Sequence, residues 1–158
     1  MISSQDIFTI SSQKQFEKIA LKVFRYQHEN NKCYREFCDF LNTDVQKVKS
    51  LEKIPFLPIQ FFKSHDVVST TEAIQEIFTS SGTIGMITSK HLVTDVSLYE
   101  QSYRLAFSEF YGNIEDYCVL ALLPSYLERE GSSLIYMVED LIQSSNHENS
   151  GFYLHNYD

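Results

Sequence analysis

The sequence predicts an α/β protein with a helical first third followed by a mainly parallel β/α sheet. Apolar residues recur at helical spacing up to about residue 53. From about residue 74, short β-type runs alternate with amphipathic helical stretches. Strands that alternate with helices pair in parallel and carry the helices on the faces of the sheet. We expect one domain over residues 1–158, made of a helical region (1–53), a connector (54–73) and a β/α region (74–158).

The helical region contains two stripes of apolar residues at helical spacing and a shorter third stripe. Ser12 and Gln15 have the spacing of a capping box, so a helix should begin there. A second helix follows, and a short third helix should start near Thr43 or Asp44. The stripes are most simply packing faces. Their apolar members are Phe16, Ile19, Ala20, Val23 and Phe24; then Tyr34, Phe37, Cys38 and Leu41; then Val45, Val48 and Leu51.

Two prolines end the helical region between Ile54 and Ile59, because each proline restricts the residue before it to extended backbone. This segment should be a stiff connector that places Phe61 and Phe62 against another part of the protein.

Strands and helices alternate in the β/α region. We expect strands over 74–79, near 91–93, over 117–123 and from 151, and the continuous apolar run 117–123 is typical of a strand buried on both faces. One helix should begin after Thr94 or Asp95 and end at Gly112, and another should begin after Ser132 or Ser133. Their expected core positions are Val96, Tyr99, Tyr103, Ala106, Phe107 and Phe110, and Leu134, Met137, Val138, Leu141 and Ile142.

The chain stops soon after the last expected strand begins. A parallel sheet cut there would leave an unpaired edge strand. We therefore expect these 158 residues to be the N-terminal fragment of a longer chain.

Composition excludes several classes of function. Apolar residues make up 43% of the chain, with 12 Phe and 10 Tyr, which favours a folded core over disorder. A net charge of −8 repels polyanions, so nucleic-acid binding is not expected. The longest uncharged stretch, residues 77–89, is too short and too polar to span a membrane.

Cysteine usage and the N-terminus indicate a cytoplasmic protein. The first residues lack the basic start and apolar run of an export signal. Three cysteines form neither a disulfide framework nor a metal-binding pattern, which suits a reducing compartment. Cys33 and Cys38 should point to different helix faces. Cys118 lies in the apolar run and should be an inert core thiol.

The chemistry of the chain is concentrated in residues 79–90. Six hydroxyl side chains and two glycines, with no charge, lie between Thr79 and Ser89, and Lys90 follows. Glycines let backbone amides converge, so the segment has the composition of an anion-binding loop, placed after a strand where α/β folds bind ligands. It is neither a Walker A loop nor a dinucleotide fingerprint. A flexible Ser/Thr-rich loop without a ligand is the alternative interpretation.

Three blocks of sequence together resemble a known family. The segment Thr79–Gly85 resembles the phosphate loop of adenylate-forming enzymes. The proline–phenylalanine segment Ile54–Val67 and the segment Leu123–Arg129, followed by Ser132–Leu134, resemble blocks of the acyl-protein synthetase (LuxE) family, which is related to phenylacetate–coenzyme A ligases. The likeness runs from about residue 50 to residue 142. It implies a partial adenylate-forming, acyl-CoA synthetase-like N-terminal domain.

The resemblance implies a ligase that uses ATP and Mg²⁺. A carboxylic acid, in this family a fatty acid, would attack the α-phosphate of ATP, and the acyl group of the resulting acyl-adenylate would pass to a thiol. An acyl reductase or acyl-carrier protein would be the partner. Two residues of the last block, Tyr126 and Arg129, would lie at the substrate mouth. The ATP phosphates would be bound by Thr79, Ser80, Ser81, Gly82, Thr83, Gly85 and Lys90.

Several alternatives stay open. His91, rather than Lys90, is an alternative for the cation that contacts the phosphates. Ile84 stands where the usual loop has a threonine. No catalytic residue and no metal ligand is assigned, and none of the three cysteines matches the family's acyl acceptor. We expect the chain alone to be inactive. An aryl- or acyl–coenzyme A ligase of the phenylacetate–CoA ligase group, or a truncated, non-catalytic interaction module, are the competing interpretations.

Overall fold

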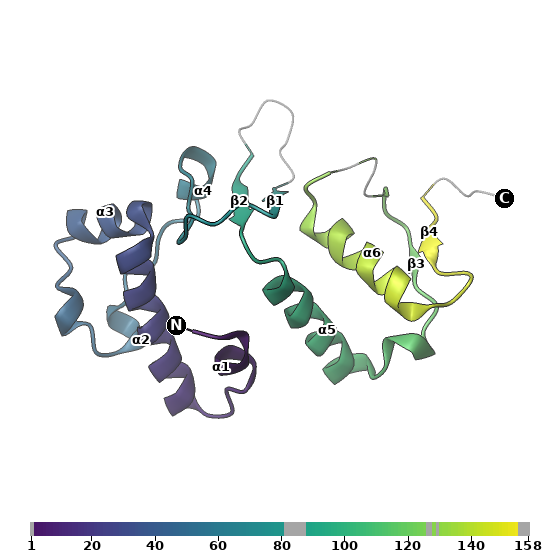
Figure 1. Cartoon of the computed structure of the whole chain (residues 1–158), viewed down its shortest axis with the longest axis horizontal. Helices are drawn as coiled ribbons and strands as arrows, with labels where there is room; N and C mark the ends of the chain where they lie inside the picture. The colour runs from purple at the N-terminus through teal and green to yellow at the C-terminus, as the bar shows by residue number, and fades with distance from the viewer. Residues whose placement is uncertain (1, 81–87, 126–127, 129, 155–158) are drawn as a thin grey trace. The chain divides into compact units, whose positions relative to one another are not determined.

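The computed structural model describes residues 2–80, 88–125, 128 and 130–154 (Figure 1). About half of the chain is helical and the strands are short, so the expected mixture of helices and strands is confirmed. The chain divides into two compact units, which are described separately. Unit 1 is Met1–Ile74 with Ser89–Thr94, and unit 2 is Gln75–Thr88 with Asp95–Asp158.

Unit 1 is mainly helical. Its elements are α1 (Ser4–Phe8), α2 (Gln13–Asn30), α3 (Lys32–Phe40), the 3₁₀ turns η1 (Val45–Lys47) and η2 (Leu51–Lys53), α4 (Phe61–Ser64) and the strand β2 (Lys90–Val93).

Unit 2 contains β1 (Glu76–Thr79), α5 (Ser97–Tyr111), the 3₁₀ turn η3 (Ile114–Asp116), β3 (Leu120–Ala121), α6 (Ser133–Ser145) and β4 (Gly151–Phe152). None of the described helices combines the length and the apolar character needed to cross a bilayer.

The start of α2 confirms the predicted cap, with one change. The Ser12 hydroxyl accepts a hydrogen bond from the Gln15 amide at 3.3 Å. The Gln15 side chain reaches back to the amide of Ser11 at 2.9 Å, one residue before the position that a capping box would use. Two orphan amides at the helix start are thereby satisfied.

The core of unit 1 lies where α2 and α3 meet the turns that follow them. Phe24, Tyr34, Cys38 and Val48 form the buried cluster, whereas Cys33 is half-buried, so the two helical cysteines do point to different faces. The expected third helix is wrong, because residues 45–53 form two separate 3₁₀ turns. Three apolar residues on so short a segment do not offset the cost of nucleating an α-helix.

The connector packs as predicted. The Tyr34 hydroxyl donates to the carbonyl oxygen of Pro55. The ring of Phe61 lies edge-on to Phe37, with centroids 5.7 Å apart, and Phe62 lies against His91 at 5.8 Å. Both phenylalanines therefore hold α4 against other elements of unit 1.

In unit 2, β3 and β4 pair in parallel, and α6 lies between them in sequence. Leu120 is opposite Gly151 and Ala121 is opposite Phe152. The parallel arrangement expected from the sequence is confirmed for this pair. Strands β1 and β3 are shorter than the predicted ranges 74–79 and 117–123, whereas β2 covers the predicted range near 91–93.

The expectation that residues 117–123 are buried on both faces is wrong. Ala121 is only 6% exposed, but its neighbours Leu120 and Leu122 are 61% and 73% exposed. Successive strand side chains point to opposite faces, so a strand covered on one face buries alternate residues only. Cys118 is exposed as well, which overturns its interpretation as a core thiol.

The predicted cap of α6 is confirmed, because the Ser132 side chain accepts a hydrogen bond from the amide of Ile135. The predicted cap of α5 is wrong, because the N-cap residue is Val96 and not Thr94 or Asp95. The Asp95 carboxylate nevertheless accepts from the amide of Ser97, the first residue of α5, at 3.1 Å. Parts of the buried faces of both helices also differ from the prediction. Phe110 is 79% exposed, whereas the ring of Phe107, on another face of α5, contacts Tyr117. In α6, the residue with 2% exposure is Ile135, whereas Leu134 is 49% exposed.

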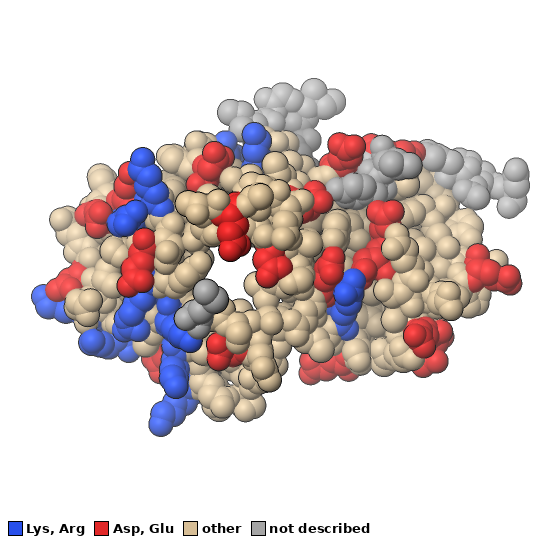
Figure 2. All heavy atoms as spheres, in the orientation of Figure 1, with Lys and Arg blue, Asp and Glu red and all other residues tan. Residues whose placement is uncertain are grey.

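The two units differ strongly in charge. Unit 1 carries eleven of the thirteen lysines and arginines and nine acidic residues, which gives +2. Unit 2 carries two basic and twelve acidic residues, which gives −10. In Figure 2, the basic side chains gather over α2 and α3, and acidic side chains predominate over α5 and α6. Lys90 lies in unit 1, whose net positive charge attracts anions.

Candidate functional site

The strand β1 leads directly into the segment for which the sequence predicts phosphate binding. Phe78 is buried, and its ring lies edge-on to Tyr99 and Tyr136, with centroids 5.3 and 5.6 Å apart. Thr79 points the other way, as alternation along a strand requires, and both Thr79 and Ser80 are exposed. The buried phenylalanine thus anchors β1 and leaves two hydroxyl-bearing residues at the surface.

The end of β1 is tied to the turn before α6. The amide of Thr79 donates a 2.7 Å hydrogen bond to the carbonyl oxygen of Gly131. The Thr79 hydroxyl lies 3.5 Å from the same oxygen, a weak contact. The Thr79 amide is therefore used inside the protein, and only its side chain remains to meet a ligand.

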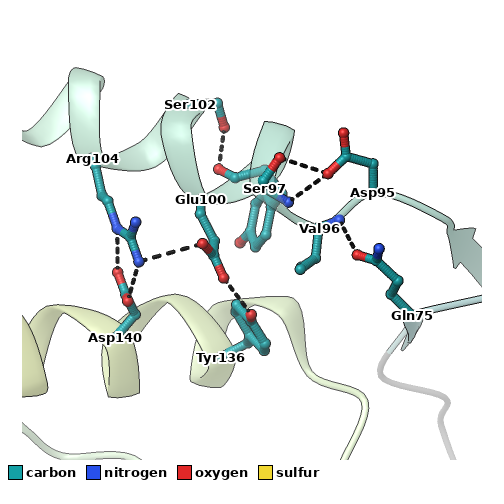
Figure 3. Close-up of polar contacts among 10 residues, drawn as sticks. Gln75, Asp95, Val96, Ser97, Glu100, Ser102, Arg104, Tyr136 and Asp140 are labelled. Carbon is teal, nitrogen blue, oxygen red and sulfur yellow. Dashed lines mark hydrogen bonds and ion pairs between the residues drawn. The ribbon is translucent and has the colours of Figure 1, made fainter. Parts of the chain in front are cut away.

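A polar network between α5 and α6 includes Tyr136, one of the two tyrosines that contact Phe78 (Figure 3). The Arg104 guanidinium donates to both carboxylate oxygens of Asp140, at 2.9 and 2.5 Å, and lies 3.4 Å from Glu100. The Tyr136 hydroxyl donates to Glu100 at 2.7 Å. This network was not predicted from the sequence, although Glu100 and Arg104 have the i, i+4 spacing of a helical ion pair.

The protonation states of this network indicate a structural role. The Arg104 guanidinium, through its hydrogen bonds, holds the pKa of Asp140 below its ordinary value. Burial, followed by the Glu100 carboxylate, raises the pKa of Tyr136 to about 12. Burial also raises the pKa of Tyr99 and Tyr103. None of these groups changes charge near neutral pH, so they support β1 rather than exchange protons.

The other flank of the predicted loop belongs to unit 1. Lys90 opens β2 and is exposed, as is His91 beside it. The contact between His91 and Phe62 joins this flank to the proline–phenylalanine block. In unit 2, the amide of Thr79 donates to Gly131, which lies between the two parts of the third block. One flank of the predicted loop is thus in contact with the proline–phenylalanine block, and the other is bonded to a residue adjacent to the third block.

The structure places three of the predicted site residues. Thr79, Ser80 and Lys90 are all exposed. The remaining predicted phosphate ligands and the two substrate-mouth residues lie outside the described residues, and so does Ile84; these are Ser81, Gly82, Thr83, Gly85, Tyr126 and Arg129. Within residues 2–80, 88–125, 128 and 130–154, no three His, Cys, Asp or Glu side chains gather closely enough to hold a metal ion.

Comparison with known proteins gives the family. The family model described as acyl-protein synthetase, LuxE, matches residues 1–115. A long-chain-fatty-acid–luciferin-component ligase from Vibrio harveyi is 32% identical over 81 residues, which are 50% of this chain and 21% of that ligase. The match thus spans about a fifth of the relative's length. No solved structure matches the chain. Because the family model covers well over half of the sequence, this chain belongs to the acyl-protein synthetase (LuxE) family.

Proposed function

We propose that this chain supplies the ATP-phosphate-binding segment of an acyl-protein synthetase-like ligase. The ligase activates a fatty acid as acyl-adenylate and transfers the acyl group to a thiol. Family membership and the relative named a fatty-acid ligase support this function. The structural observation that carries it is the hydrogen bond between Thr79 and Gly131, because it fixes two exposed hydroxyl residues at the start of a Gly/Ser/Thr-rich segment.

The described residues suit a polyphosphate. Hydroxyl groups donate hydrogen bonds to phosphate oxygens, and the ammonium group of Lys90 adds a positive charge. The hydroxyls of Thr79 and Ser80 and the ammonium of Lys90 are exposed where a nucleotide can reach them. In this proposal Ser81, Gly82, Thr83 and Gly85 complete the set, and Mg²⁺ enters with ATP.

The chemistry required of these residues is charge stabilisation. When the acid's carboxylate oxygen attacks the α-phosphorus of ATP, the bond to the β-phosphate oxygen breaks and pyrophosphate leaves with additional negative charge. In this proposal, hydrogen bonds from the hydroxyl groups and the positive charge of Lys90 stabilise that charge at the β- and γ-phosphates. A thiol then attacks the acyl carbonyl and AMP leaves. An acyl reductase or acyl-carrier protein would receive the product.

The direct test is acid-dependent exchange of labelled pyrophosphate into ATP, measured with the full-length encoded protein, Mg²⁺ and fatty acids of graded length. We expect exchange that Gly82→Val or Lys90→Ala lowers at least tenfold, which corresponds to about 1.4 kcal/mol. Lys53→Ala, which removes an exposed lysine on η2, is the matched control and should leave exchange unchanged. Absence of exchange with every fatty and aromatic acid would overturn the ligase and favour a non-catalytic interaction module.

A second measurement separates the two kinds of ligase. An acyl-protein synthetase should form a covalent acyl-protein with labelled fatty acid and ATP in the absence of coenzyme A. A ligase of the phenylacetate–CoA type should instead release AMP only when coenzyme A is supplied. Acylation of the protein without coenzyme A supports our proposal. AMP release that requires coenzyme A would instead show a coenzyme A ligase.

A further inference from the structure

Gly131 has a geometry that only glycine accommodates. Its φ is +76°, in the left-handed region that favours glycine. A Cβ atom added there would lie 3.0 Å from the hydroxyl oxygen of Thr79 and 3.2 Å from the carbonyl oxygen of Ile77. The absence of a side chain therefore serves two purposes at once, the backbone conformation and the close approach of β1.

Both partners of the hydrogen bond between Thr79 and Gly131 are next to residues whose packing fixes their positions. On the donor side, Phe78 is buried between Tyr99 and Tyr136. On the acceptor side, the next residue after Gly131 caps α6, and Ile135 in the first turn of that helix is almost completely buried. A side chain at position 131 would therefore press against the backbone of Ile77 and the side chain of Thr79, and β1 would have to shift to relieve the contact.

We infer that Gly131 is a positioning residue for nucleotide binding, since it sets the position of Thr79 at the start of the phosphate-binding segment. This inference rests on the proposed function. Gly131 touches no nucleotide itself; it acts through the amide of Thr79, whose hydroxyl is one of the proposed phosphate ligands. A displaced Thr79 would weaken the binding of ATP while leaving the binding of the carboxylic acid unchanged.

The chain contains a matched control for the backbone effect. Gly112, which ends α5, also has a positive φ, +88°, but an added Cβ would have no atom within 4 Å. Gly112→Ala therefore introduces the strain of positive φ alone. Gly131→Ala introduces a side chain at positive φ together with the contact with Thr79, so a rise in KM for ATP confined to this variant reports the positioning.

The experiment compares KM values for Mg·ATP and for fatty acid in the pyrophosphate exchange assay, with thermal unfolding of each variant alongside. We expect Gly131→Ala to raise KM for ATP at least fivefold with KM for the acid unchanged, and Gly112→Ala to leave both unchanged. Equal KM values for ATP in the two variants would overturn the role of Gly131 while leaving the ligase intact. Absence of exchange in the unmodified protein would overturn the ligase, and with it this role.

A measurement on the unmodified protein covers the case in which Gly131→Ala does not fold. Hydrogen exchange followed by NMR should show the Thr79 amide protected as strongly as the core amides of α6, because its hydrogen bond opens only when that region unfolds. A Thr79 amide that exchanges as fast as an exposed amide would show that Gly131 does not hold it, and would overturn the inference.

Discussion

Arg104 and Asp140 form a two-point ion pair between α5 and α6, with nitrogen–oxygen distances of 2.9 and 2.5 Å. Arg104 also pairs with Glu100, which accepts a hydrogen bond from Tyr136, and the Tyr136 ring contacts Phe78, the residue that anchors β1. A link between two helices thus helps to hold the strand that ends at Thr79, the first of the proposed phosphate ligands. Stability and the candidate site are connected through these contacts.

Loss of this ion pair should lower the stability of the protein measurably. Arg104→Ala and Asp140→Asn should each cost about 1 kcal/mol in the free energy of unfolding, and the double variant should cost less than their sum. Urea denaturation of the four proteins checks this. The exposed pair of Lys47 and Asp44 is the control, and Lys47→Ala should cost less than about 0.5 kcal/mol. Strict additivity in the cycle would mean that Arg104 and Asp140 do not interact.

The ion pair of Arg104 and Asp140 should no longer stabilise the folded protein in acid. The pKa of Asp140 is lower in the folded protein than its ordinary value of 3.8, so its contribution to stability is fully present above that value. The contribution disappears as the pH falls through the folded pKa. The stability difference between the unmodified protein and Arg104→Ala should therefore be constant from pH 7 to about pH 5 and shrink below about pH 4. Urea titrations across this range measure it, and a difference that grows in acid would contradict the assignment.

The buried face of α6 can be tested with two adjacent residues. Ile135→Ala should cost about 3 kcal/mol, because it leaves a cavity in a closely packed region. Leu134→Ala removes a half-exposed side chain of nearly the same size and should cost less than about 1 kcal/mol. Thermal or urea unfolding of both variants gives the comparison. The reverse order would mean that the face predicted from the sequence, with Leu134 inside, is the correct one.

The cysteines should differ in reactivity. Cys118 is exposed, whereas Cys38 is completely buried and its pKa is raised, mainly by that burial. A thiol reagent such as DTNB should label Cys118 rapidly in the folded protein and Cys38 only after unfolding. Cys118→Ser should abolish the rapid phase, and Cys33→Ser, at the half-buried position, should preserve it. A rapid phase that survives Cys118→Ser would show that another thiol is accessible.

Local signals in the sequence identified most of the element boundaries. Ser12 and Ser132 begin helices because a hydroxyl satisfies amides of the first turn, and this requires only neighbouring residues. Gly112 ends α5 because glycine accepts a positive φ. The same local chemistry did not predict the two 3₁₀ turns over residues 45–53, where a short apolar stripe resembles a helix.

The composition of the sequence indicated where the candidate site lies, but it did not predict which distant residues contact that segment. Glycines and hydroxyls between Thr79 and Lys90 indicate an anion-binding segment within one stretch of the sequence. The partner of Thr79 is Gly131, fifty-two residues further along the chain. No periodicity or spacing connects two positions so far apart, because their contact depends on how β1 packs against the residues before α6.

The amino-acid sequence alone therefore determined the class of elements, the beginnings of α2 and α6 and the family, since each depends on residue types close together or on an ordered set of motifs. Only the tertiary structure decided which face of each element is buried. Helical spacing fits Leu134 or Ile135 as the inner residue of α6, and an apolar run fits a strand covered on one face or on both. The neighbours that a side chain meets after folding decide between these alternatives, and those neighbours come from distant parts of the chain.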